Sequence, residues 1–265
     1  MITSKDNLRI KHVRALQADG KARREAGAFV VEGVRLVEEA LASGWPTQWV
    51  IYTEGLDQRG QAVLTGFSQR GVPVEQVTPL VMRSASDTQT PQGLLAVLQA
   101  QSLPLPADLN FVFIPDGVRD PGNLGTMLRT AAAAGVQGVL LPPGSVDPFS
   151  PKVLRSAMGA QFRLPIHSLT WEDIRRIISQ AGLKVYLAEV SDGEIYSRVD
   201  WRIPLALIIG SEAEGAGPDA QHLANKRVII PMPGGGESLN AASAAAVLLF
   251  EAVRQRASTI NKPIA

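Results

Sequence analysis

Short apolar runs that alternate with helical segments dominate the second half of the chain, and they restrict its possible folds more than any other feature. Each run spans three to five residues and is followed by a segment in which apolar residues have helical spacing. Runs that are apolar throughout are typical of parallel strands covered by helices on both faces. The sequence therefore predicts an α/β domain with a parallel sheet. We expect its strands at residues 111–114, 139–141, 185–188, 205–209 and 228–230.

The first hundred residues predict a second, smaller α/β unit. Apolar spacing indicates helices at 34–41 and 62–70 and strands at 49–52 and 94–98. Further along, Pro104 and Pro106 prevent a continuing helix and favour an extended linker. We therefore expect two domains, at residues 1–100 and 108–265, with a linker at about 101–107.

Composition excludes several classes of protein. With 265 residues, 45% of them hydrophobic and 19% charged, the chain fits two globular domains that each bury a core. The absence of cysteine excludes disulfides and a thiolate nucleophile, and His12, His167 and His222 are too scattered to suggest a metal site. No signal-like N-terminus or apolar run of about 18 residues is present, so we expect no membrane insertion and a cytoplasmic location.

Positive charge is concentrated at the N-terminus. The whole chain has a net charge of +1, whereas residues 1–35 contain eight basic and four acidic residues. Such a segment can neutralise phosphates, which would make nucleic-acid binding salt-dependent. A solvated helix face has the same composition, so charge alone does not decide between these interpretations.

Three loops that follow predicted strands combine glycines with hydrogen-bonding side chains. They span residues 116–125, 210–217 and 230–240, and the last leads through three glycines into an alanine-rich helix. Ligands of parallel sheets bind at the carboxyl ends of strands, where exposed backbone and helix N–H groups are available. These loops therefore predict a ligand site. Its candidate polar residues are Asn123, Arg129, Glu212, Ser238 and Asn240.

The same loops lack the motifs of common nucleotide and hydrolase sites. Neither of the first two has the G-x-G-x-x-G spacing of a dinucleotide-binding turn, and no Walker-type phosphate loop is present. Ser238 is not on a G-x-S-x-G elbow and has no histidine near it in sequence. A nucleotide-dependent oxidoreductase or a hydrolase is therefore disfavoured.

In order, spacing and residue type, the three loops resemble the three motifs of the SpoU (TrmH-type) RNA 2′-O-ribose methyltransferases, a branch of the SPOUT superfamily. Residues 123–125 with Arg129 resemble the first motif, 210–212 the second and 230–240 the third. Residues 1–98 resemble the ribosomal-protein-like substrate-binding domain of that family. The segments that carry this second resemblance are residues 27–33 and 90–93.

The resemblance implies a deep trefoil knot, which is a rare exception to ordinary chain topology. It also implies that S-adenosylmethionine is bound in a bent conformation in the knot and that a homodimer completes the active site. Cofactor contacts are expected from five positions, mainly through backbone. These are Gly210, Ile230, Met232, Gly234 and Leu239.

The resemblance also assigns roles to the polar residues, and each has a simpler alternative. Arg129 is expected to act on the attacking ribose 2′-hydroxyl by positioning and charge stabilisation, or else forms a surface salt bridge. Asn123 contacts Arg129 or RNA, or caps a helix that begins at Leu124. Glu212 orients substrate or is an ordinary loop carboxylate, while Ser238 and Asn240 contribute active-site contacts, with Ser238 as a plain helix N-cap in the alternative.

RNA contacts are expected from the basic N-terminal segment and from residues 147–160, which resemble the ribosomal-RNA-acting members of the family. The expected contact residues are Lys11, Arg14, Arg23, Arg24, Lys152 and Arg155.

Together these features predict methyl transfer from S-adenosylmethionine to a ribose 2′-hydroxyl of ribosomal RNA, without a metal. We expect a large-subunit nucleotide, with guanosine preferred over uridine. Two alternatives remain open: the same chemistry on transfer RNA, and a non-catalytic assembly factor that binds ribosomal RNA.

Overall fold

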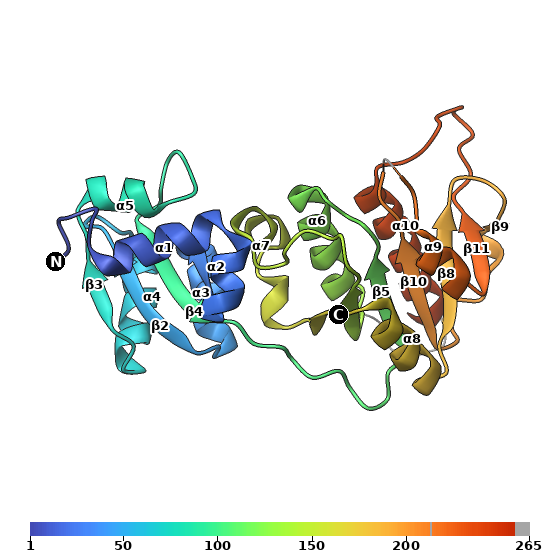
Figure 1. Ribbon diagram of the computed structural model, residues 1–265, viewed down its shortest axis with the longest axis horizontal. Coiled ribbons are helices and arrows are strands. Elements are labelled where there is room, and N and C mark those ends of the chain that lie inside the picture. The colour runs from blue at the N-terminus through green and yellow to red at the C-terminus, as the bar shows by residue number, and fades with distance from the viewer. Residues whose placement is uncertain (213, 258–265) are drawn as a thin grey trace. The chain divides into compact units, whose positions relative to one another are not determined.

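The computed structural model describes residues 1–212 and 214–257, and it divides into two compact units (Figure 1). The first unit combines Met1–Gln101 with Phe149–Phe162. The second combines Ser102–Pro148 with the chain from Arg163 onward. The chain therefore passes between the units three times.

The first unit is built on a four-stranded sheet with the order β1-β4-β2-β3. β4 is antiparallel to both of its neighbours, whereas β2 and β3 are parallel. The strands predicted at 49–52 and 94–98 lie within β2 and β4. The strand bounds are β1 (Ala28–Glu32), β2 (Thr47–Tyr52), β3 (Val74–Gln76) and β4 (Leu94–Gln99).

Helices cover this sheet and supply its core. Apolar residues of α1 and α5, such as Val13 and Met82, are buried against Val30, Ile51 and Leu95 of the strands. This burial removes apolar surface from water and holds the unit together. The helix bounds are α1 (Leu8–Ala18), α2 (Gly20–Ala26), α3 (Val34–Ser43), α4 (Gln58–Gln69) and α5 (Pro79–Ala85).

Residues 149–162 complete the first unit, although the sequence analysis assigned them to the second domain. They form α7 (Pro151–Ala157) and the short 3-10 helix η1 (Ala160–Phe162). Phe149 packs on Phe29 with ring centroids 4.8 Å apart, and Phe162 meets Trp45 edge-on at 5.4 Å. Large aromatic rings dominate burial energetics, so these contacts explain why the segment folds with the first unit.

A seven-stranded sheet with the order β7-β6-β5-β10-β8-β11-β9 forms the second unit. Every neighbouring pair in it is parallel, as the apolar runs predicted. The edge strands β7 and β9 were not predicted, because they are two or three residues long and carry polar residues. The strand bounds are β5 (Phe111–Pro115), β6 (Gly138–Leu141), β7 (Ile166–Ser168), β8 (Lys184–Glu189), β9 (Glu194–Ile195), β10 (Leu205–Ile209) and β11 (Lys226–Ile229).

Helices lie on both faces of this sheet (Figure 1). Ile174 of α8 and Ala220 of α9 pack on one face with alternate strand residues such as Val112 and Ile208. α6 and α10 pack against each other and against β5 and β10. The helix bounds are α6 (Pro121–Ala133), α8 (Trp171–Gln180), α9 (Pro218–Leu223) and α10 (Ala241–Ala257), with a 3-10 turn η2 at Tyr196–Arg198.

Two expectations bear on this fold. The α/β class with a parallel sheet is confirmed, whereas the trefoil knot stays a prediction, because strand order alone does not establish it. Within residues 1–212 and 214–257, no helix combines the length and apolar character needed to cross a membrane.

Candidate functional site

The first motif opens α6. Asp120 is the N-cap, its carboxylate accepts the backbone N–H of Asn123 at 2.8 Å, and Pro121 occupies the first turn. Both residue types are preferred at these positions, so the helix begins three residues earlier than Leu124. The interpretation of Asn123 as an N-cap is therefore wrong. Its side chain is left available for other contacts.

Arg129 lies further along α6 on the exposed side. Leu124, Met127 and Leu128 of the same helix are fully buried, so the apolar stripe faces the core as predicted. Arg129 is exposed, and its guanidinium forms no hydrogen bond or ion pair with any residue that the structure describes. The alternative of a surface salt bridge therefore has no partner within this part of the chain.

The third motif leads into α10, which begins at Ala241. The Asn240 Oδ1 atom accepts the backbone N–H groups of Ala242 at 3.0 Å and Ser243 at 3.2 Å, which is N-cap geometry. Asn240, and not Ser238, therefore caps the helix, and the N-cap alternative for Ser238 is wrong.

All three motifs meet at the side chain of Asn240. Since its Oδ1 faces the helix, its Nδ2 points outward and donates to Asn123 Oδ1 at 3.1 Å and to Glu212 Oε1. Glu212 Oε1 also accepts the backbone N–H of Ala241 at 3.1 Å. A carboxylate at a helix N-terminus satisfies unpaired N–H groups and complements the helix dipole. Glu212 is thus no isolated loop carboxylate.

The loop between β10 and α9 is closely packed. A Cβ atom on Gly210 would lie 2.3 Å from the backbone nitrogen of Ala216 and 2.3 Å from the carbonyl carbon of Gly215. Ser211 and Gly215 exchange two backbone hydrogen bonds of 2.9 and 3.0 Å. Only glycine fits at position 210 without displacing this loop.

Asp116, directly after β5, fastens the far end of that loop. Its Oδ2 accepts the backbone N–H of Gly217 at 2.7 Å, and its side chain is buried. Burial raises the pKa of the Asp116 carboxyl, an effect opposed by the Gly217 hydrogen bond and reinforced by the negative charge of Asp219.

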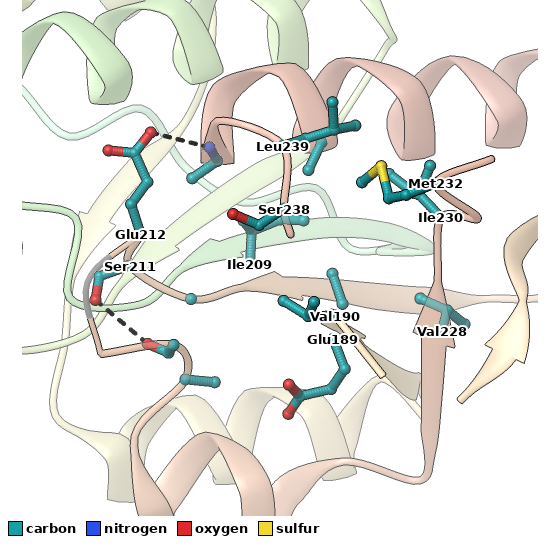
Figure 2. Close-up of a pocket in the computed structure, with 16 residues that line it drawn as sticks. Glu189, Val190, Ile209, Ser211, Glu212, Val228, Ile230, Met232, Ser238 and Leu239 are labelled. Carbon is teal, nitrogen blue, oxygen red and sulfur yellow. Dashed lines mark hydrogen bonds between the residues drawn. The ribbon is translucent and has the colours of Figure 1, made fainter. Parts of the chain in front are cut away.

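A pocket opens between these loops at the carboxyl ends of β8, β10 and β11 (Figure 2). Of the predicted site residues, six line it: Gly210, Glu212, Ile230, Met232, Ser238 and Leu239. Gly234 does not line it, and nothing lies within 4 Å of the position that a Cβ on this glycine would take. Gly235 and Gly236 are likewise not among the residues that line the pocket.

Glu189 also lines the pocket, and the sequence analysis missed it. It is the last residue of β8, directly after the apolar run at 185–188. A carboxylate at the carboxyl end of a parallel strand is the signal that would have identified it.

The cationic residues expected to contact RNA differ in whether their side chains are free to reach a phosphate. Arg23 is buried and donates to the carbonyls of Leu16 at 2.6 Å and Gln17 at 3.3 Å, so the expectation that it meets phosphates is wrong. Arg155 forms an ion pair with Asp87 at 2.8 Å.

The other four lie on the surface. Lys11 pairs with Asp6 at 3.3 Å and Arg14 donates to the Lys5 carbonyl at 3.3 Å, while Arg24 and Lys152 are exposed.

Acidic and histidine side chains do not gather elsewhere in a pattern suited to a metal. Within residues 1–212 and 214–257, no three of the histidine, aspartate and glutamate side chains lie close enough to hold an ion.

Comparison with known proteins agrees with this geometry. Residues 110–250 match the model of the SpoU rRNA Methylase family, and residues 7–96 match the MRM3-like substrate binding domain. The chain is 34% identical to the Bacillus subtilis 23S rRNA (guanosine(2553)-2'-O)-methyltransferase RlmP over 94% of this chain and 97% of that protein. It is 32% identical to the Streptomyces viridochromogenes 23S rRNA (uridine(2479)-2'-O)-methyltransferase over 97% of this chain and 93% of that protein.

A solved structure extends the similarity to three dimensions. The AdoMet-bound rRNA methyltransferase from Sinorhizobium meliloti superposes with a TM-score of 0.85 at 33% identity, covering 96% of this chain and 97% of that one. Matching motifs, matching domain order and near-complete coverage lead to one conclusion. The chain belongs to the SpoU rRNA methylase family.

Proposed function

We propose that this protein transfers a methyl group from S-adenosylmethionine to a ribose 2′-hydroxyl of large-subunit ribosomal RNA. The observation that carries the proposal is the junction at Asn240, whose amide joins Asn123 of the first motif to Glu212 of the second at the rim of the pocket. The relatives named as 23S rRNA 2′-O-methyltransferases, which span nearly the whole chain, support the same reaction and substrate. The predicted cytoplasmic location is part of the same proposal.

The residues that line the pocket fit S-adenosylmethionine. This cofactor combines a flat aromatic ring with a positively charged sulfonium. The described lining offers apolar surface from Val228, Ile230, Met232 and Leu239, and it contains carboxylates but no lysine or arginine. An anionic, partly apolar pocket favours a cation with an aromatic portion.

The polar residues of the three motifs have distinct roles in the proposed methyl transfer. S-adenosylmethionine supplies an electrophilic methyl group when it is bound. As the ribose 2′ oxygen of the RNA bonds the methyl carbon, the bond from that carbon to sulfur breaks, S-adenosylhomocysteine leaves and the hydroxyl proton passes to solvent. The Arg129 guanidinium stabilises negative charge on the attacking oxygen. Asn240 and Glu212 hold the start of α10 in place, so that Ser238 stays at the pocket wall.

Arg129→Ala tests this assignment. We expect kcat to fall by about 100- to 1,000-fold because charge stabilisation is lost, while the Kd for S-adenosylmethionine changes by less than about threefold. Single-turnover assays and calorimetry measure the two quantities. Arg176→Ala, which removes an exposed arginine of α8 paired with Asp173, is the matched control and should leave both unchanged. Loss of cofactor affinity with normal turnover at saturation would contradict the role.

The substrate is tested with unmodified ribosomal and transfer RNAs and methyl-labelled S-adenosylmethionine. We expect label in one alkali-resistant ribose of large-subunit RNA, and a guanosine is the first position to examine. Label in transfer RNA alone would establish the alternative substrate. Cofactor binding without label in free RNA or in ribosomal particles would support the assembly factor.

We also propose a homodimer through α10. Phe250 is 48% exposed on this helix, whose other side is buried through residues such as Ala245 and Ala252, and we place its ring at the centre of the partner surface. Light scattering should detect a dimer that Phe250→Lys converts to monomers. The same change at Leu80, an exposed residue of α5, is the control that should leave the dimer intact.

Finally, we propose that the first unit binds RNA through its exposed cations. Arg24 is exposed, unlike its neighbour Arg23, and its side chain has no hydrogen bond or ion pair within the described residues. Arg24→Ala should weaken RNA binding and lower its salt slope by about one, with cofactor binding unchanged. Arg59→Ala is the control, because Glu38 already engages that guanidinium.

A further inference from the structure

Glu189 occupies a distinctive place in the pocket wall. It ends β8, where it lies in register with Ile229 of β11, and Figure 2 shows its carboxylate on the opposite side of the pocket from Ser238 and Leu239. The other lining carboxylate, Glu212, already accepts hydrogen bonds from Asn240 and Ala241. Glu189 is therefore the carboxylate that the junction of the three motifs does not use.

A chain of side chains holds Glu189 in place. Arg227 of β11 donates from Nη2 to Gln221 Oε1 at 2.9 Å, and Gln221 donates from Nε2 to Glu189 Oε1 at 2.6 Å. Because arginine is only a donor, it fixes the amide oxygen of Gln221 toward itself and the amide nitrogen toward the carboxylate. One oxygen of Glu189 is thus anchored, and Oε2 has no partner among the described residues.

The second oxygen of Glu189 is an acceptor that can take hydrogen bonds from the hydroxyl groups of a ligand. Glu189 lies beside the apolar part of the pocket, since its neighbour Ala188 pairs with Val228 in the sheet. A flat ring on that apolar surface would bring an attached ribose to the carboxylate. In dinucleotide-binding sheets, an acidic residue near the end of a strand likewise accepts hydrogen bonds from ribose hydroxyls.

We propose that Glu189 binds the ribose hydroxyls of the adenosyl group of S-adenosylmethionine and that Gln221 is the positioning residue that orients it. The inference rests on the proposed function, because it takes this pocket as the cofactor site. It adds a side-chain contact to a pocket whose expected cofactor contacts are mainly backbone.

Calorimetry with S-adenosylhomocysteine and its 2′-deoxyribose analogue tests the proposal. The wild-type protein should bind the deoxy analogue about 10- to 100-fold more weakly, the range expected when a hydrogen bond to a charged group is lost. Glu189→Gln should lose a similar factor for S-adenosylhomocysteine but bind the deoxy analogue within about threefold of wild type. Gln221→Met should show a smaller loss of the same selectivity.

Control variants distinguish loss of this contact from a general effect of removing a negative charge. Glu214→Gln makes the same chemical change at an exposed carboxylate outside the pocket, paired with Arg119 at 3.3 Å, and should alter neither affinity. In Glu189→Gln, the KM for S-adenosylmethionine should rise while kcat at saturation stays near the wild-type value. Melting temperatures close to wild type would show that the variants are folded.

Three results would overturn the inference. Unchanged binding of S-adenosylhomocysteine by Glu189→Gln would show that the carboxylate does not touch the ligand. Equal losses of affinity of Glu189→Gln for S-adenosylhomocysteine and its deoxy analogue would place the contact elsewhere on the ligand. A loss of affinity confined to S-adenosylmethionine would place the contact at the sulfonium. If the wild type bound none of these ligands, the proposed function would fail together with the inference.

Discussion

Two walls of the same pocket are built in opposite ways. In the first wall, the backbone of Gly210 packs on that of Gly215 and Ala216, Ser211 and Gly215 exchange backbone hydrogen bonds, and Asp116 accepts the N–H of Gly217. In the segment from Pro231 to Asn240, every residue except Met232 is exposed, and three consecutive glycines have open space around them. A glycine is therefore required for fit in the first wall and not in the second, although both sequences look alike as glycine-rich loops.

The largest expected effect is that of Gly210→Ala. The added methyl would overlap the backbone at Gly215 and Ala216, which cannot rotate away as a side chain can. We expect a loss of about 3 kcal/mol or more in the free energy of unfolding, with cofactor binding abolished at 25 °C. Urea denaturation followed by circular dichroism measures the first quantity and calorimetry the second. Near-normal stability would show that the first wall is as adaptable as the second.

Substitution of Asp116, which holds Gly217 by a hydrogen bond, should have the next largest effect on stability. Asp116→Ala leaves the half-buried N–H of Gly217 without its acceptor, which costs about 1–3 kcal/mol. Asp116→Asn keeps an acceptor and provides the control.

The pH dependence of these variants has a defined sign. Because burial raises the pKa of Asp116, the folded state holds the proton more tightly than the unfolded state. The contribution of this group is therefore greatest below its ordinary pKa and is lost as pH rises through the raised value. The stability of Asp116→Asn relative to wild type should increase with pH over that window in denaturant titrations. If the free energies of unfolding of Asp116→Asn and wild type differed by the same amount from pH 3 to 7, the raised pKa of Asp116 would be contradicted.

The third prediction concerns the residue that joins the two walls. Asn240→Ala removes a helix cap, and we expect a loss of about 1–2 kcal/mol and a clear loss of activity. Asn240→Ser keeps a cap acceptor but lacks the amide N–H that reaches Asn123 and Glu212. It should restore most of the thermal stability without restoring turnover. Recovery of both together would mean that capping, and not the junction, is what activity requires.

The smallest expected effect is in the open wall. Gly236→Ala adds a methyl where nothing lies within 4 Å, and its φ is not in the left-handed region, so the free energy of unfolding should change by less than about 0.5 kcal/mol. Gly235→Ala is the comparison variant, because its φ of 76° costs a non-glycine residue about 1–2 kcal/mol. A large effect of Gly236→Ala on cofactor affinity, measured by calorimetry, would indicate that the second wall closes tightly when ligand binds.

The parallel sheet was predictable because each of its five inner strands contains a short apolar run, and the position of the pocket was predictable because its loops follow those strands. The residues at which the helices begin were not predictable from sequence. A run such as Asp120-Pro121-Gly122-Asn123 offers two possible caps, and only the folded backbone selects Asp120. The same holds for Ser238 and Asn240, which lie two residues apart in one polar stretch.

Contacts between residues far apart in the chain were harder to predict from sequence. Glu189 becomes a candidate only when β8 and β11 are known to be neighbours, and Arg23 looks like any surface cation until α1 and α2 are placed. The aromatic residues Phe149 and Phe162 gave no indication that they fold with residues more than a hundred positions earlier. Sequence periodicity reports which face of an element is buried but not which partner buries it.

The membership of Phe149–Phe162 in the first unit also has a consequence for synthesis of the protein. A ribosome that has just made the last strand of that unit, β4, has yet to produce α7 and η1. Domains generally fold in order from the N-terminus at about 5–20 residues per second, so completion of this one waits roughly 3–12 s for the next 60 or so residues. Until then Phe29 and Trp45 lack their contacts with Phe149 and Phe162, and the nascent chain leaves the exit tunnel with an incomplete core.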